Sequence, residues 1–135
     1  MDVVIDANIL FAALIKKNDT SRLMFSDKLK LHAPEFIFDE FTKYKDVLLE
    51  KTHRLEDEFF HLVSIFKQRI HVVSKNEYQE YLEKGREIAP DPKDDAYFAL
   101  ALKLNVPIWT HDKKSKEKQA IIEIITTKDL LLMNL

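Results

Sequence analysis

The stretch that decides the fold is DDAYFALALKLNVPIWTHD, residues 94–112. Residues 92–104 form a strongly apolar pattern that predicts a buried helix, and residues 106–110 predict a strand directly after it. An acidic residue, Asp112, follows that strand. A helix that leads straight into a buried strand is typical of α/β domains.

The same alternation continues outward from this stretch to both ends of the chain. The predicted strands cover residues 3–5, 29–33, 70–73, 106–110 and 121–125. The predicted helices cover residues 8–17, 21–29, 35–52, 55–69, 76–86 and 92–104. Such alternation argues for a parallel sheet covered by helices on both faces. The 135 residues show no repeat or linker, so a single domain over residues 1–135 is expected.

Composition excludes several classes of protein. The chain has no cysteine, which removes disulfides, thiolate nucleophiles and cysteine-based zinc sites. It has one glycine, whereas phosphate-binding loops and dinucleotide fingerprints need several. The net charge of −2 requires any basic surface for nucleic acid to be local. Residues 1–6 do not resemble a signal peptide and no membrane span is apparent, so a cytoplasmic location is expected.

Two acidic residues follow predicted strands. In parallel sheets, ligands bind beyond the carboxyl ends of the strands. Asp6 comes directly after residues 3–5, and Asp112 comes shortly after residues 106–110, where the Thr110 hydroxyl is suited to hold it. Either acid alone has a structural alternative, because Asp is also a good helix cap and turn residue.

Helix geometry indicates which way the Glu40 side chain points. The apolar stripe of the helix predicted over residues 35–52 contains Ile37, Phe41, Tyr44 and Leu48. Glu40 lies within this stripe, and an inward carboxylate is costly unless it is paired or bound to a metal. The alternative is a glutamate at the edge of the stripe that turns outward or pairs with a basic residue.

Two adjacent acids open the apolar helix, and one of them is a candidate ligand. Asp91 suits the N-cap and Pro92 the first helical position. Asp94 then suits a capping box, whereas Asp95 shares a face with Phe98. We therefore expect Asp95 to be the functional acid, with Asp94 as the second choice.

Several carboxylates in one place favour a metal. Two of them about 4 Å apart repel by roughly 4 kcal/mol at an effective dielectric near 20, so a cluster needs a cation. Oxygen ligands without cysteine or clustered histidine suit Mg²⁺ or Mn²⁺. Such ions activate water and clamp phosphate oxygens during phosphodiester cleavage. His32, His53, His61 and His71 show no ligand spacing and are expected to be structural.

Taken in order, these residues resemble the PIN domain. The resemblance covers nearly the whole chain. It rests on Asp6-Ala7-Asn8-Ile9-Leu10, Glu40, Asp95-Ala96 before an apolar helix, and Thr110-His111-Asp112 after a strand. It implies a three-layer α/β/α sandwich with a central, mainly parallel sheet of about five strands. It also implies Mg²⁺- or Mn²⁺-dependent ribonuclease activity.

The resemblance assigns roles to individual residues. The implied catalytic and metal-binding residues are Asp6, Glu40, Asp95 and Asp112, and Asn8 and Thr110 match the supporting polar positions. His111 departs from the small residue that is common in the family, and is either a phosphate contact or simply exposed. Lys113 and Lys114 belong either to a local basic rim for RNA or to a solvated charge run.

The resemblance also implies partners and leaves alternatives. Many stand-alone PIN domains of this size are toxins of VapBC-type toxin–antitoxin pairs, and many self-associate, so an antitoxin and a homodimer or higher oligomer are expected. Others act in RNA processing, and a catalytically silent module that binds RNA or protein is the alternative. A phospho-acceptor signalling domain is disfavoured, because no aspartate closely follows residues 70–73.

Overall fold

The computed structural model describes residues 1–15 and 17–135, and these form a sheet with helices on both sides. The sheet has five parallel strands in the order β3-β2-β1-β4-β5. The strands are β1 (Asp2–Ile5), β2 (Lys30–Pro34), β3 (Ile70–Val73), β4 (Ile108–Trp109) and β5 (Ile124–Ile125). The predicted α/β fold with a parallel sheet is therefore confirmed.

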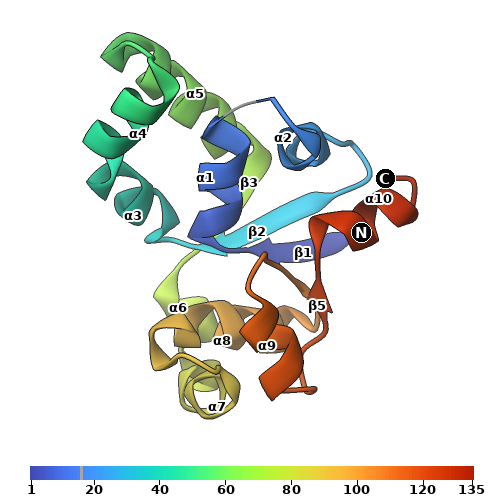
Figure 1. Ribbon diagram of the computed structural model, residues 1–135. Helices are drawn as coiled ribbons and strands as arrows, with labels where there is room; N and C mark the ends of the chain where they lie inside the picture. The colour runs from blue at the N-terminus through green and yellow to red at the C-terminus, as the bar shows by residue number, and fades with distance from the viewer. Residues whose placement is uncertain (16) are drawn as a thin grey trace.

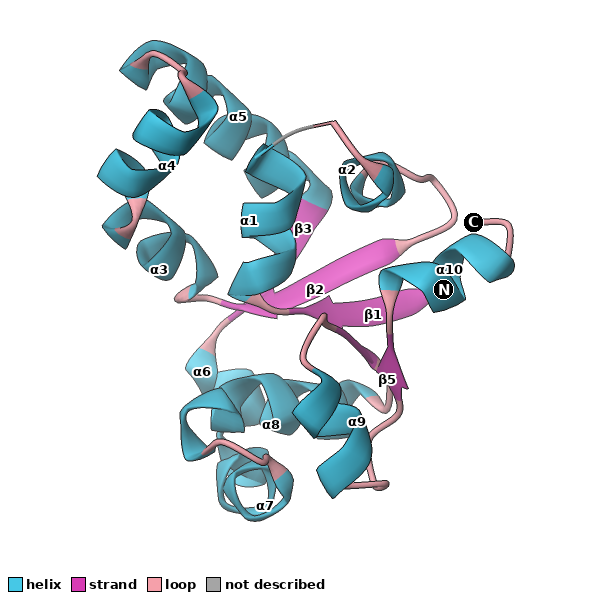
Figure 2. Cartoon of the chain, viewed as in Figure 1, coloured by secondary structure: helices cyan, strands magenta, loops and turns pink. Residues whose placement is uncertain are grey.

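Helices form the two outer layers (Figures 1 and 2). One side holds α1 (Ala7–Ile15), α2 (Asp19–Met24), α3 (Ile37–Lys43), α4 (Lys45–Thr52), α5 (Glu56–Arg69) and α10 (Thr127–Leu132). The other holds α6 (Lys75–Tyr78), α7 (Leu82–Ile88), α8 (Asp95–Leu104) and α9 (Lys113–Lys118). Within the described residues, no helix is long and apolar enough to cross a membrane.

The central strand β1 explains why the sheet is covered on both faces. Val3, Val4 and Ile5 are completely buried although their side chains alternate between the two faces. Such a continuous apolar run suits a strand inside a parallel sheet. Both neighbours of β1 are parallel, with Val4 opposite His32 on β2 and Ile108 on β4. All three strands therefore end at the same edge of the sheet.

Two long helices of the prediction are broken in the structure. The helix predicted over residues 35–52 divides at Tyr44, which ends α3 and precedes α4. Neither glycine nor proline marks this break. The Tyr44 ring instead packs edge-on against Phe11 with 5.6 Å between centroids, a tertiary contact that helix periodicity does not encode. The helix predicted over residues 76–86 divides into α6, the 3₁₀ turn η1 (Gln79–Tyr81) and α7.

Other boundaries also differ from the prediction. The first helix, predicted over residues 8–17, ends at Ile15, and Lys16 lies outside the described residues. The second predicted helix shortens to α2, and the last strand to β5. Neither α9 nor α10 was predicted. The α9 sequence, KKSKEK, has no apolar periodicity, and the helix begins where the Asp112 side chain caps it.

The single glycine of the chain lies where α7 meets α8. A Cβ atom at Gly85 would lie 2.6 Å from the Asp95 carbonyl oxygen and 2.8 Å from the Ala99 backbone nitrogen. Both distances are shorter than van der Waals contact, and both neighbours are backbone atoms. The two helices therefore pack backbone to backbone at this point, which only glycine allows.

Replacing Gly85 by alanine should therefore destabilise the protein. The gain in helix propensity, about 1 kcal/mol, is smaller than the upper end of the overpacking cost, about 1–3 kcal/mol. We expect the free energy of unfolding to fall by up to about 2 kcal/mol in denaturant titrations. Glu83→Ala, on an exposed position of the same helix, is the control and should change it by less than about 0.5 kcal/mol. Equal stability of the two variants would contradict the close packing.

Candidate active site

The hydroxyl group of Thr110 connects the two acids that follow β1 and β4. It donates a hydrogen bond to Asp6 Oδ2 at 2.5 Å and accepts one from the Asp112 backbone N–H at 3.0 Å. Thr110 itself is only 2% exposed. Ile5 on β1 lies opposite Trp109 on β4, so the next residues of both strands emerge side by side. The structure thus brings Asp6 and Asp112 to one edge of the sheet.

Both carboxylates also serve as helix caps. Asp6 Oδ1 accepts a hydrogen bond from the Ile9 backbone N–H at 3.1 Å, at the start of α1. Asp112 Oδ1 accepts one from the Lys114 backbone N–H at 3.0 Å, and its Oδ2 accepts one from the Ser115 hydroxyl at 3.2 Å. The structural alternative weighed for each acid is therefore present as well. These bonds fix the orientation of both carboxylates.

The third acid of the group is Asp94 rather than Asp95. Asp94 lines a small cavity of about 10 Å³ together with Asp6, Tyr97, Thr110 and Asp112. A cavity of this size is close to the space that one water molecule occupies. Asp95 lines neither this cavity nor the cleft beside it, and its charge acts on Tyr78.

A short 3₁₀ turn explains why the structure favours the second choice of the sequence analysis. The predicted helix starts not as an α-helix but as η2 (Pro92–Asp94), so α8 begins only at Asp95. The cap is made by the Asp91 side chain, which accepts a hydrogen bond from the Lys93 backbone N–H at 3.0 Å. Asp94 was expected in a capping box, but the changed helical phase turns it towards Asp6 and Asp112.

Glu40 lies at the border of this group. Ile37 and Phe41 of α3 are buried as predicted, whereas Glu40 is exposed and not inside the apolar stripe. Its carboxylate is nevertheless close enough to interact with the others. Partial burial raises the pKa of Glu40, and the charge of Asp6 adds to this effect. Glu40 therefore faces the acids from the opposite helical layer.

The acids destabilise one another's ionised forms. Burial raises the pKa of Asp94 to about 6, and the charges of Asp6, Asp91, Asp112 and Glu40 contribute to the shift. Burial also raises the pKa of Asp6, although the hydrogen bonds from Thr110 and Ile9 oppose it. Such a group accumulates negative charge that a cation would neutralise.

Tyr97 is a member of the site that the sequence analysis missed. Tyr97 is 4% exposed, and its hydroxyl makes no hydrogen bond of ordinary geometry among residues 1–15 and 17–135. The hydroxyl is nevertheless near enough to the Glu40 carboxylate to lower the pKa of that group. Burial, followed by the charges of Glu40, Asp6 and Asp94, raises the pKa of Tyr97 well above its ordinary value. A buried hydroxyl without a partner is costly. In the sequence, Tyr97 could not be distinguished from the apolar residues around it.

A cleft with basic residues opens beside the acids. It has a volume of about 440 Å³, and Lys114 and Lys118 of α9 line it together with Asp94 and Asp112. Lys113 is exposed but does not line this cleft. The exposed His111 instead makes a hydrogen bond through Nε2 with the Thr127 hydroxyl at 2.9 Å.

Asn8, the other predicted supporting residue, is exposed on the first turn of α1. In the described part of the chain, no three histidine or acidic side chains are arranged closely enough to hold a metal ion. The donor set still suits one, because it consists of carboxylate oxygens that repel one another. The acids are neighbours, but they do not form a finished coordination sphere.

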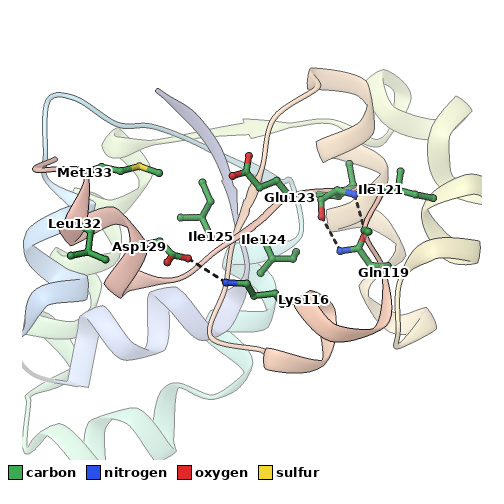
Figure 3. A pocket seen from close by; sticks show the side chains of 11 residues that line it. Lys116, Gln119, Ile121, Glu123, Ile124, Ile125, Asp129, Leu132 and Met133 are labelled. Atoms are coloured by element: carbon green, nitrogen blue, oxygen red, sulfur yellow. Dashed lines mark hydrogen bonds and ion pairs between the residues drawn. The ribbon is translucent and has the colours of Figure 1, made fainter.

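A larger pocket lies on the far side of β5, between α9 and α10 (Figure 3). It has a volume of about 710 Å³ and is mainly lined by aliphatic side chains such as Ile121 and Leu132. Lys116 and Asp129 form an ion pair of 3.8 Å across it. Its lining includes none of Asp6, Glu40, Asp94 and Asp112. This pocket is therefore larger than the acidic cleft but separate from the candidate active site.

The raised pKa of Asp94 predicts how stability depends on pH without added metal. Because the folded pKa of about 6 exceeds the ordinary value of 3.8, the folded protein binds this proton more tightly than the unfolded chain. The resulting stabilisation is complete below about pH 3.8 and is lost as the pH rises through about 6. Asp94→Asn should reduce this loss between pH 4 and 7, measured by denaturant titration in a chelator. The control Asp39→Asn, on the exposed surface of α3, should keep the wild-type slope.

Comparison with known proteins agrees with the fold. A model of the PIN domain family matches residues 4–124. This region extends from β1 to β5 and includes Asp6, Glu40, Asp94, Asp95 and Asp112. A search of curated proteins found no match. PIN domains are commonly nucleases, and they typically use a divalent metal ion. With most of its length matched by the family model, the chain belongs to the PIN domain family.

Proposed function

We propose that the protein is a metal-dependent ribonuclease that hydrolyses phosphodiester bonds. The observation that carries this proposal is the convergence of Asp6, Asp94 and Asp112 around the Thr110 hydroxyl and one small cavity. Asp6, Glu40, Asp94 and Asp112 would hold Mg²⁺ or Mn²⁺. We propose Asp94 in place of Asp95 in the quartet, because Asp94 lines the cavity with Asp6 and Asp112 and the charges of these acids act on it.

The residues of the chain would divide the work in a simple way. A bound divalent ion supplies an activated water and neutralises charge on the phosphate. Thr110 and the Ile9 N–H hold the Asp6 carboxylate in one orientation before any ion arrives. A bound cation would offset the repulsion between Asp94 and the neighbouring carboxylates, so Asp94 would lose its proton when the cation binds.

RNA is the proposed substrate. Lys114 and Lys118 lie in the cleft that also contains Asp94 and Asp112, so their ammonium groups are placed to bind phosphates next to the one that is cleaved. This local basic rim is compatible with a net charge of −2. His111 and Lys113 are further candidate contacts for RNA. Both are exposed, His111 in the loop before α9 and Lys113 at the start of α9.

Two biological roles fit a ribonuclease of this kind. A toxin of a VapBC-type pair, inhibited by an antitoxin and active as a homodimer, is one setting for such a nuclease, and RNA processing is the other. The competing function is a silent module that binds RNA or protein. It is favoured by the lack, among the described residues, of a ready three-ligand metal group. Calorimetric measurement of Mn²⁺ binding distinguishes the nuclease from the silent module, because only the nuclease requires a bound metal ion.

Neutralising single acids tests the nuclease. Asp6→Asn and Asp94→Asn should each reduce cleavage of RNA in Mg²⁺ or Mn²⁺ by more than the roughly 100-fold that loss of an outer-shell partner costs. Asp95→Asn is the matched control on the adjacent position and should retain activity within a few-fold. Thermal unfolding of each variant verifies the fold. The site assignment fails if Asp6→Asn cleaves normally, and the choice of Asp94 fails if Asp95→Asn is the inactive variant.

Tyr97→Phe should separate stability from activity. Removing a buried hydroxyl without a partner should raise the free energy of unfolding of the metal-free protein by about 1 kcal/mol. Cleavage should fall about 10-fold if the hydroxyl donates to an acid or to bound water in the active state. Tyr78→Phe, which alters a buried tyrosine beside Asp95, should leave cleavage unchanged. A less stable Tyr97→Phe variant would show that the hydroxyl is satisfied in the protein.

A further inference from the structure

A group of polar side chains outside the acidic site crosses three adjacent strands. His32 on β2 and His71 on β3 are direct neighbours in the parallel register, and their Nδ1 atoms are 3.1 Å apart. On its other side, His32 Nε2 lies 2.9 Å from Asp2 Oδ1 on β1. Both histidines are structural in the sequence-based prediction, because neither shows ligand spacing in the sequence. The strand register that makes them neighbours is not visible there.

The Asp2 carboxylate determines how His32 presents its ring. An ionised carboxylate only accepts hydrogen bonds, so Nε2 of His32 carries the proton that it donates to Asp2. The hydrogen bond from His32 keeps the pKa of Asp2 below its ordinary value, which maintains the charge of the acceptor. In neutral His32, Nδ1 therefore carries a lone pair, and that lone pair faces His71. A carboxylate, a histidine and a free ring nitrogen form the arrangement found behind many metal ligands.

The spacing of the two Nδ1 atoms suits a shared metal ion. With metal–nitrogen distances of about 2.0–2.1 Å, nitrogens 3.1 Å apart subtend an angle of about 100° at the ion, close to that of a tetrahedral site. The His71 ring is exposed, and the torsion that rotates an imidazole is soft, so a small rotation can direct both lone pairs to one point. We propose that His32 and His71 bind a transition-metal ion of the Zn²⁺ type, with Asp2 orienting His32.

This site is separate from the proposed nuclease centre. The hollow that contains His32 and His71 shares no lining residue with the cleft or the cavity of the acids. Asp2, which orients His32, begins β1, whereas Asp6 follows its end. The chemistry also differs, because imidazole nitrogens prefer Zn²⁺, Cu²⁺ and Ni²⁺, whereas carboxylate clusters prefer Mg²⁺ and Mn²⁺. Two nitrogens leave the remaining positions to water, so the site binds reversibly and does not resemble a closed structural zinc site.

Nearby charges limit the affinity without blocking the site. Lys30 and Arg69 line the same shallow hollow, of about 280 Å³, as the two histidines. Arg69 is directed to backbone carbonyl groups, with Nε 3.0 Å from the Met24 oxygen and Nη2 2.8 Å from the Ser26 oxygen. Lys30 remains near Asp2, and its charge partly opposes that of the carboxylate. The affinity expected for two histidines and an orienting aspartate is therefore moderate.

Calorimetric titration of the full chain with ZnCl₂, in buffer containing excess Mg²⁺, tests the proposal. Wild-type protein should bind one Zn²⁺ per chain at this site. His71→Ala should weaken binding at least 10-fold, and Asp2→Asn should weaken it about 10-fold by removing the orienting carboxylate. His61→Ala, an exposed histidine on α5, is the matched control and should bind like the wild type. His71→Gln, which keeps a polar side chain, provides a second variant if the alanine variant is unstable.

Two results would overturn the proposal. One is Zn²⁺ binding by the His71 variants that equals that of His61→Ala, which would leave the histidine pair as a simple hydrogen bond. The other is loss of the same binding event in Asp6→Asn, which would place the ion at the acidic centre. Binding that persists in Asp6→Asn and is lost in both His71 variants supports the site whether or not the protein cleaves RNA.

Discussion

The parallel pairing of β1 with β4 is the constraint on which the rest of the structure depends. Its register sets Ile5 opposite Trp109, so Asp6 and Thr110 leave the sheet as neighbours. One hydroxyl then holds the side chain of the first acid and the backbone of the last. Two segments separated by about a hundred residues are thereby fixed together. Asp6 and Asp112 cap α1 and α9, so this contact also fixes where both helices begin.

Asp6 and Asp112 each have a structural role and a proposed chemical role. Asp6 and Asp112 cap helices, and helix capping is usually a sufficient reason for an aspartate. Here the capping bonds also hold each carboxylate at a distance from Asp94 that raises its pKa, with burial as the largest cause. Capping therefore keeps like charges close together in the folded protein without a cation. The carboxylates of Asp6 and Asp112 are thereby oriented in advance. The acids of the described residues must still move closer together to complete a coordination sphere.

Much of this organisation follows from the sequence, and the exceptions have identifiable causes. Apolar runs predicted the strands, and the rule for carboxyl ends of parallel strands placed Asp6 and Asp112 near each other. The choice between Asp94 and Asp95 depended on helical phase, which a single 3₁₀ turn changed. Tyr97 looked like any core residue, because only packing reveals that its hydroxyl has no partner among the described residues. The histidine pair depended on a strand register that no local pattern encodes.

The backbone contact at Gly85 gives the outermost helix an influence over the acids. Because backbone atoms of α7 and of the first turn of α8 meet at Gly85 without intervening side chains, the two helices have no room to come closer together there. Asp94 immediately precedes that turn, so a displacement of α7 would be transmitted to its carboxylate. The place of Asp94 relative to Asp6 therefore depends on how α7 packs, although no α7 residue lines the cleft or the cavity of the acids.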